Sequence, residues 1–159
     1  RVASRGLGDV YKRQNILSTF NIEYDYIIID CPPSLNILTV NALSAASGVL
    51  IPVQCEFFAL QGLSELITTI DTIKNSSNKD LIIKGIIRTM FDPRNNLATD
   101  VSAQLLKFFD DKVYRTIIPR NITLAEAPSH GMPVINYDKG SKGALSYLSL
   151  VGEIIKQER

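Results

Sequence analysis

The chain has 159 residues, of which 45% are hydrophobic and 21% are charged, and its formal net charge is +1. This composition is ordinary for a globular chain that buries a core, and the small net charge excludes attraction of the whole protein to DNA or membranes. Its apolar runs are shorter than the roughly 18 residues of a membrane span, and no signal peptide is evident. Cys31 and Cys55 lack a metal-ligand spacing, which favours two buried, reduced thiols in a cytosolic protein.

The chain starts with a segment unlike the rest. Residues 1–14 follow neither the helical nor the strand period, so we expect them to be non-native or disordered and 15–159 to form part of one domain. Residues 26–29 are all apolar and end at Asp30, and Pro32 follows closely, which predicts a strand buried on both faces that stops at the proline. The Asp30 carboxylate would then lie where open α/β sheets bind ligands; alternatively, it caps a turn.

Further along the chain, predicted helices and strands alternate. The pattern favours a right-handed crossover between each pair of parallel strands, and therefore an α/β fold. In the closing helix we expect the apolar side chains of Leu145, Leu148, Val151 and Ile155 to face inward. The predicted elements are a helix over 34–46 capped by Ser34, a strand over 49–53 that should bulge or end near Pro52, a helix over 59–75, a strand over 81–90 broken by Gly85, a helix over 97–110, a strand over 113–118, a helical turn at 123–126, an extended piece at 133–135 and a helix over 141–157.

A hydrophobic strand that ends in aspartate is half of a nucleoside-triphosphatase site, in which the carboxylate orients Mg²⁺, usually through water. The other half is a glycine-rich loop whose backbone amides and lysine hold the phosphates. The sequence contains no G-x-x-x-x-G-K-[ST] pattern, and Gly6 and Gly8 do not continue into G-x-G-x-x-G. The strand with its aspartate is therefore a weak indication by itself, because many α/β proteins share it.

Five segments carry a more specific pattern: 25–34, 51–56, 89–94, 118–121 and 126–131. In their order and spacing they resemble the ParA/Soj family of chromosome- and plasmid-partitioning ATPases, which are deviant Walker A members of the P-loop class and relatives of MinD. The resemblance extends from about residue 15 to the carboxyl terminus. It implies a three-layer, P-loop NTPase-like fold with a doubly wound, mostly parallel sheet, here truncated at the N-terminus.

The resemblance also implies roles for single residues. Asp30 matches the Walker B aspartate that holds Mg²⁺ through water, and Pro32 lies in the switch segment that senses the γ-phosphate. Pro119 and Asn121 match the loop that lines the adenine pocket. Met90, at the end of the neighbouring strand, would pack against the base.

For DNA, Arg94 matches a basic residue that dimeric family members place on the backbone, and Arg120 is a candidate for the same surface. Two departures from the family pattern matter. The position of the family's second DNA-contacting arginine holds Thr123, which has no charge to release a counterion. The phosphate loop with its catalytic lysine is missing, so we assign no catalytic residue and expect the chain alone to be inactive towards ATP.

These implications define an expected function. The chain would be part of a cytoplasmic, nucleoid-associated ATPase that binds ATP and Mg²⁺, forms a homodimer, binds DNA non-specifically and hydrolyses ATP when a ParB-like protein stimulates it. No membrane partner is expected. The alternatives are a non-catalytic DNA- or partner-binding module on the same scaffold, or a MinD-like relative. The mixed charge of residues 156–159 argues against a MinD-type membrane helix.

Overall fold

The computed structural model describes residues 24–32 and 36–158. The chain divides into two compact units, one made of residues 1–49 and 65–82 and the other of residues 50–64 and 83–159. Each unit is described by itself. The predictions for residues 1–23 and for Ser34 lie outside the described residues.

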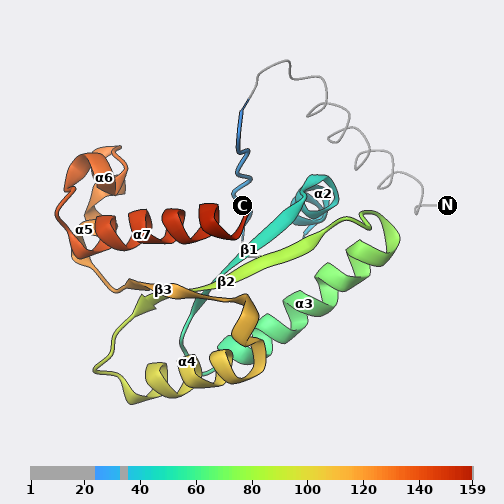
Figure 1. The fold of residues 1–159 in the computed structure, drawn as a ribbon, viewed down its shortest axis with the longest axis horizontal. Coiled ribbons are helices and arrows are strands. Elements are labelled where there is room, and N and C mark those ends of the chain that lie inside the picture. The colour runs from blue at the N-terminus through green and yellow to red at the C-terminus, as the bar shows by residue number, and fades with distance from the viewer. Residues whose placement is uncertain (1–23, 33–35, 159) are drawn as a thin grey trace. The chain divides into compact units, whose positions relative to one another are not determined.

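The second unit contains a three-stranded sheet with the order β1-β2-β3, in which β2 lies in the middle (Figure 1). The strands are β1 (Gly48–Gln54), β2 (Ile82–Phe91) and β3 (Val113–Pro119), and only the first residues of β1 and β2 belong to the first unit. Strands β2 and β3 are parallel. The predicted α/β class and the three strand positions are therefore confirmed.

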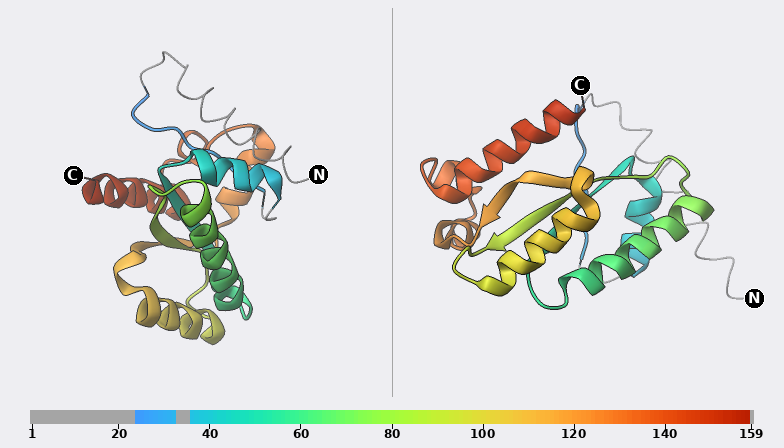
Figure 2. Two further views of the ribbon diagram at one scale, coloured as in Figure 1. Left: turned by 90° about the vertical axis from the view of Figure 1, so that its right-hand side faces the viewer. Right: turned by 60° about the horizontal axis from the view of Figure 1, so that its bottom comes forward.

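Two helices flank β3 in this unit. Helix α4 (Asn96–Phe109) and helix α7 (Lys142–Gln157) lie on opposite sides of the strand (Figures 1 and 2). Between β3 and α7 come the short elements α5 (Ile122–Glu126), η2 (Ala127–His130) and α6 (Val134–Tyr137), and a 3-10 turn, η1 (Asp110–Lys112), precedes β3. The core between the sheet and α7 consists of Ile87, Tyr114, Ile118 and Leu150, with Leu124 and Ile154 packed against it.

Two local predictions for this unit were wrong. Strand β1 is not among them: it passes through Pro52, which an edge strand tolerates because one side of it needs no N–H donor, and it ends two residues later at Gln54. Strand β2 is not broken at Gly85, because the ring of Tyr114 occupies the space where a side chain at 85 would lie. The piece at 133–135 is not extended: Pro133 precedes the helical turn α6, a position where its missing N–H costs nothing.

The predicted inward face of α7 was also wrong. Its buried residues are Gly143, Ala144 and Leu150, and a side chain at 143 would overlap Leu124. The small residues let the start of the helix approach Leu124 closely, which fixes its rotation and turns the bulkier apolar residues outward. The residues that face solvent instead are Leu145, Leu148, Val151 and Ile155.

In the first unit, helix α2 (Ile37–Ala45) begins at Asn36, whose side chain accepts the N–H groups of Leu38 and Thr39. The side-chain amide of Asn78 donates to the carbonyls of Leu43 and Ala46, at 2.9 and 2.7 Å, and so satisfies the carboxyl end of this helix. Helix α3 (Ala59–Ser76), whose residues 59–64 belong to the second unit, buries Leu63, Ile70 and Ile73, as its periodicity predicted. None of the described helices is both long enough and apolar enough to cross a membrane.

The strand predicted to end at Asp30 is not formed. Residues 24–32 have no regular secondary structure, and Ile28 is 89% exposed. A run of β-branched residues becomes a strand only when neighbouring strands complete its hydrogen bonds and cover its side chains. The sheet of the described residues consists of β1, β2 and β3, and none of them pairs with this segment.

Strand β3 contains an irregularity that both neighbouring elements stabilise. The register between β2 and β3 shifts, from Ile86 opposite Val113 to Arg88 opposite Ile117. On one side the buried Arg88 guanidinium donates to the carbonyls of Tyr114 and Arg115, at 2.9 and 3.1 Å. On the other side the Glu153 carboxylate of α7 accepts two backbone N–H groups.

These two N–H groups belong to Arg115 and Thr116, at 2.7 and 2.9 Å from Glu153. Burial acts to raise the pKa of Glu153, but the hydrogen bonds from Thr116 and Arg115 outweigh it and hold the pKa below 4.5. The stabilisation is therefore complete above pH 4.5 and is lost as the pH falls through the lower pKa of the folded chain. The carboxylate thus ties α7 to the edge strand in a pH-dependent way.

Glu153→Gln is expected to lower the free energy of unfolding by about 1 kcal/mol at pH 7, because glutamine offers one acceptor where the carboxylate offers two. The deficit should shrink as the pH falls below 4.5 and the wild-type carboxylate is protonated. Urea unfolding of both chains between pH 7 and pH 3 measures it. Glu126→Gln, the same change at an exposed side chain, is the control. A deficit that stays constant over this range would contradict the prediction.

Candidate nucleotide and DNA site

The carboxyl ends of β2 and β3 meet at one edge of the sheet. Phe91 pairs with Pro119 there, and the backbone N–H of Arg120 donates to the Phe91 carbonyl at 3.0 Å. These contacts place Met90, which precedes Phe91, beside the start of the loop that follows β3. The structure therefore brings together the residues predicted to contact a base, and it does so within one unit.

Met90 has an unusual backbone. Its φ is +49°, and it is the one non-glycine residue with a positive φ in the part of the chain that the structure describes. The register between β2 and β3 is irregular just here, between Arg88 and Phe91. A side chain in this conformation is strained by roughly 1–2 kcal/mol, and such strain gathers at ligand sites. The Met90 side chain is 52% exposed, so it has an apolar surface to offer.

Asn121 is held in place by the helix that it starts. Its side-chain oxygen accepts the N–H of Leu124 at 3.2 Å and so caps α5. This hydrogen bond fixes the amide group and directs its NH₂ donors elsewhere. With the exposed Met90 and the half-buried ring of Pro119, the edge offers two apolar surfaces and one fixed donor. That set fits the face and the edge of a planar base.

The two predicted DNA contacts lie at the same edge, and one of them, Arg94, is bound to the Asp92 carboxylate. The Nε and Nη2 groups of Arg94 donate to Asp92 at 3.0 and 2.8 Å, and the backbone N–H of Arg94 donates to the same carboxylate at 3.0 Å. Hydrogen bonds from the side chain and backbone of Arg94 lower the pKa of Asp92 to about 2, and the charge of Arg120 adds to the effect. Asp92 is therefore ionised at every physiological pH.

The predicted magnesium and switch residues belong to the first unit. Asp30 and Pro32 are both exposed. An exposed carboxylate fits a magnesium ion held through water, although among the described residues no three histidine, cysteine, aspartate or glutamate side chains gather as ligands. Of the two thiols expected to be buried, Cys55 is buried, and burial raises its pKa even though Arg88 acts to lower it. Cys31 is only half-buried, because the segment around it is exposed.

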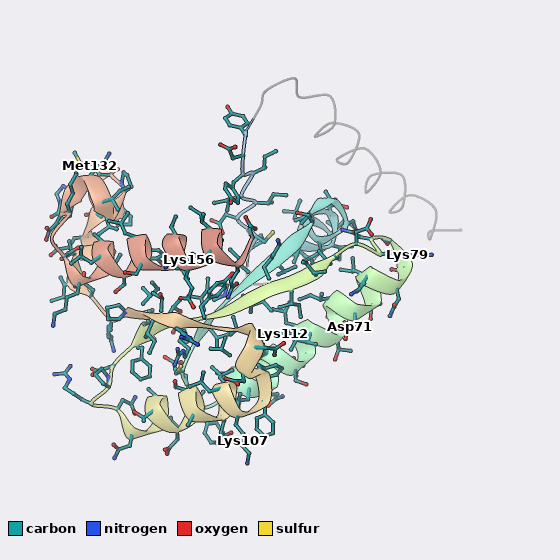
Figure 3. All side chains as sticks on the ribbon, in the orientation of Figure 1. Asp71, Lys79, Lys107, Lys112, Met132 and Lys156 are labelled. Carbon is teal, nitrogen blue, oxygen red and sulfur yellow. The ribbon has the colours of Figure 1, made fainter. Side chains whose placement is uncertain are left out.

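A hollow lies elsewhere in the second unit. It has a volume of about 630 Å³, opens widely to solvent, and is lined by residues of β3 and α7 that include Arg115, Glu153 and Lys156. Figure 3 labels Lys156 on α7. None of the predicted nucleotide or DNA contacts lines it.

Comparison with known proteins agrees with this geometry. A family model described as an AAA domain matches residues 8–83. The sporulation initiation inhibitor protein Soj of Bacillus subtilis is 56% identical over 131 residues, which are 82% of this chain and 52% of that protein. The chromosome partitioning protein ParA of Myxococcus xanthus is 51% identical over 148 residues, 93% of this chain and 52% of that protein. The chain spans about half the length of the curated relatives it matches.

Among solved structures, cobyrinic acid a,c-diamide synthase from Mycobacterium smegmatis, with a bound ATP analog and magnesium, superposes with a TM-score of 0.79. Its identity is 30%, and the match covers 96% of this chain and 56% of that one. The fold is thus of the P-loop NTPase-like ATPase class. Within that class, over the residues that align, the chain belongs to the ParA/Soj family of chromosome partitioning proteins.

Sequence reasoning missed one residue of this edge. Asp92 lies in the segment 89–94 that carries the family resemblance but was given no role of its own, whereas it binds the arginine predicted to contact DNA. The signal was present in the spacing: an aspartate two residues before an arginine, with a proline between them, allows a tight turn that brings the two side chains together.

Proposed function

We propose that this chain is part of a partitioning ATPase, in which a nucleotide base binds at the edge formed by Met90, Pro119 and Asn121. The observation that carries the proposal is the meeting of these residues with Arg94 at the carboxyl ends of β2 and β3, in a chain about half identical to Soj and ParA proteins. Ligands of open α/β sheets bind at that end of the strands.

The residues have distinct roles in this proposal. Met90 and Pro119 pack against the base, and the Asn121 amide donates to its edge. Asp30 holds Mg²⁺ through water, and Pro32 belongs to the segment that responds to the γ-phosphate. Bound Mg²⁺ would neutralise phosphate charge during hydrolysis. Because the sequence lacks a glycine-rich phosphate loop, hydrolysis also requires residues that these 159 do not supply.

The DNA-binding part of the proposal rests on charge at the surface. Arg94 and Arg120 contact the phosphate backbone without reading sequence, which is how lysine and arginine bind DNA non-specifically. Thr123 provides no third cation. In the whole protein we propose ATP-dependent homodimerisation and release from the nucleoid when a ParB-like partner stimulates hydrolysis.

A second candidate function follows from the missing phosphate loop. The arginine surface does not depend on a nucleotide, so the chain could act as a DNA-binding module alone. Two measurements separate the candidates: binding of a fluorescent ATP analogue, and binding of duplex DNA with and without ATP and Mg²⁺. If the chain is part of an ATPase, we expect it to bind the ATP analogue but not to hydrolyse ATP by itself. If it is a DNA-binding module alone, we expect it to bind duplex DNA and not to bind the analogue.

Met90→Gly tests the base contact. Glycine adopts a positive φ without strain, so the free energy of unfolding should stay the same or rise by up to about 1 kcal/mol. Analogue binding should nevertheless weaken, because the apolar surface is lost. The control is Met132→Gly, which removes the other methionine, on the turn before α6 (Figure 3). Unchanged analogue affinity in Met90→Gly would exclude this residue from the base site.

A further inference from the structure

The Asp92 carboxylate is the counter-charge of Arg94, one of the two arginines proposed to bind DNA. It holds the fork of Arg94 through two side-chain hydrogen bonds, at 3.0 and 2.8 Å. Arg120 comes directly after β3, the strand that pairs with β2, and its charge adds a small lowering to the pKa of Asp92. Two positive charges and one negative charge therefore meet at this edge, and one of the positive charges is already paired.

We propose that the Asp92 carboxylate binds the Arg94 guanidinium in the place that a phosphate would take. A polyanion must then displace this carboxylate in order to bind Arg94. The inference rests on the proposed function, because it concerns the same arginine surface. It assigns to Asp92 the role of setting the affinity and the salt dependence of DNA backbone binding. The partner that this chemistry fits is a nucleic-acid backbone with repeated phosphates.

The chemistry of the pair favours competition. A guanidinium has five N–H donors arranged as a fork, and a phosphate engages it best through two parallel hydrogen bonds, the arrangement that Asp92 already makes. The Arg94–Asp92 pair as a whole has no net charge, so Arg94 does not release a counterion from DNA until the Asp92 carboxylate is displaced. At physiological pH the carboxylate stays ionised, so release has to come from displacement.

The pair is also easily exchanged. The Arg94 side chain is 89% exposed, and Asp92 is only two residues away in the chain. Exposed ion pairs contribute little to stability, because water solvates both partners when they separate. A phosphate can therefore replace the carboxylate without disturbing the fold. Helix α4 begins directly after this turn and has no acidic residue in its first turn, so its amino-terminal end adds a favourable field for an anion.

Asp92→Asn tests the inference, because asparagine keeps an oxygen that can accept the Arg94 backbone N–H while losing the charge. Binding of random-sequence duplex DNA is followed by fluorescence anisotropy from 50 to 300 mM salt. We expect about tenfold tighter binding at the lowest salt and a slope of log K against log salt that is steeper by about 0.9. Asp111→Asn, in the turn η1 that follows α4, removes an equal charge and should change binding by less than twofold.

Arg94→Ala, alone and combined with Asp92→Asn, completes a double-mutant cycle of these two residues. It should weaken DNA binding by about tenfold at the lowest salt. In its background Asp92→Asn should tighten binding by threefold or less, through Arg120 alone. Lys107→Ala removes a cation near the far end of α4, labelled in Figure 3, and should have little effect.

The outcomes separate the inference from the function on which it rests. If Arg94→Ala weakens binding but Asp92→Asn leaves it unchanged or weakens it, Asp92 positions Arg94 and the inference is overturned. If Arg94→Ala has no effect, the DNA role of this surface is overturned as well. Circular dichroism checks that each variant folds. Asp92→Ser, a second neutral acceptor at the turn, replaces Asp92→Asn if that chain does not fold.

Discussion

Arg88→Met is expected to lower the free energy of unfolding by about 3 kcal/mol, because two buried acceptors and one partly buried acceptor lose the donor that Arg88 provides. The Arg88 guanidinium donates to the Ser102 hydroxyl at 3.0 Å and to the carbonyls of Tyr114 and Arg115. Methionine has a similar length and no polar group, so it fills the space without satisfying any of them. Urea unfolding at pH 7 measures the change.

A buried cation also costs free energy, and this opposes the prediction. Burial lowers the pKa of Arg88, while Cys55 and Glu153 act to raise it, which indicates that solvent no longer compensates the charge fully. Its Nε also has no hydrogen-bond partner in the described structure. Replacing buried ionic networks by apolar residues is often neutral or stabilising. Here the acceptors remain in place and two belong to the backbone, so we expect their loss to dominate.

Two further variants show how much of the lost stability comes from each hydrogen bond and from the charge of Arg88. Ser102→Ala removes one neutral acceptor and should cost about 1 kcal/mol. Arg88→Lys keeps the charge but cannot reach three acceptors with one compact group, so its stability should fall between the wild type and Arg88→Met. An Arg88→Met chain as stable as the wild type would mean that the cost of burying the charge equals the gain from the three hydrogen bonds.

The sequence was most informative where a helix or strand is specified by its own periodicity. Helix α3 was expected over 59–75 and spans Ala59–Ser76, because leucines and isoleucines at helical spacing define both its length and its buried face. Strand β3 was expected over 113–118 and spans Val113–Pro119, ended by the proline that predicted its end. In both cases the local pattern and the tertiary packing agree.

Prediction failed where the outcome depends on a partner that local patterns do not contain. Residues 26–29 have the composition of a central strand, but no described strand pairs with them. The buried face of α7 is decided by the small Gly143 against Leu124, which outweighs the apolar stripe. The residues that the motifs assigned to base and DNA contacts lie at one edge of the sheet in the second unit, whereas Asp30 and Pro32 belong to the first unit; the roles of all of them stay predictions. The motifs did not name the Asp92–Arg94 pair: the Asp-Pro-Arg spacing allows it, but the choice of partner is decided by side-chain geometry.

The Gly85→Ala variant is expected to lose about 2.5 kcal/mol of stability, because its new methyl group would overlap the ring of Tyr114. Glycine inside a strand normally weakens it, since glycine loses more backbone freedom and packs no side chain. Here the aromatic ring, 2% exposed, fills the vacant place, and the Tyr114 hydroxyl donates to the Lys84 carbonyl at 3.5 Å. The ring belongs to the core between the sheet and α7, so it has no room to move aside.

Gly152→Ala is the matched control, since nothing lies within 4 Å of a methyl group at that position in α7. It should raise the free energy of unfolding by roughly 0.5–1 kcal/mol, because alanine favours a helix over glycine. In a Tyr114→Leu background the ring is gone, and Gly85→Ala should then cost less than about 1 kcal/mol. Urea unfolding of the wild type, of Gly85→Ala, of Tyr114→Leu and of the double variant measures the coupling free energy between residues 85 and 114. If Gly85→Ala is as stable as the wild type, or costs the same in both backgrounds, then Tyr114 does not require glycine at 85, and the continuity of β2 has another cause.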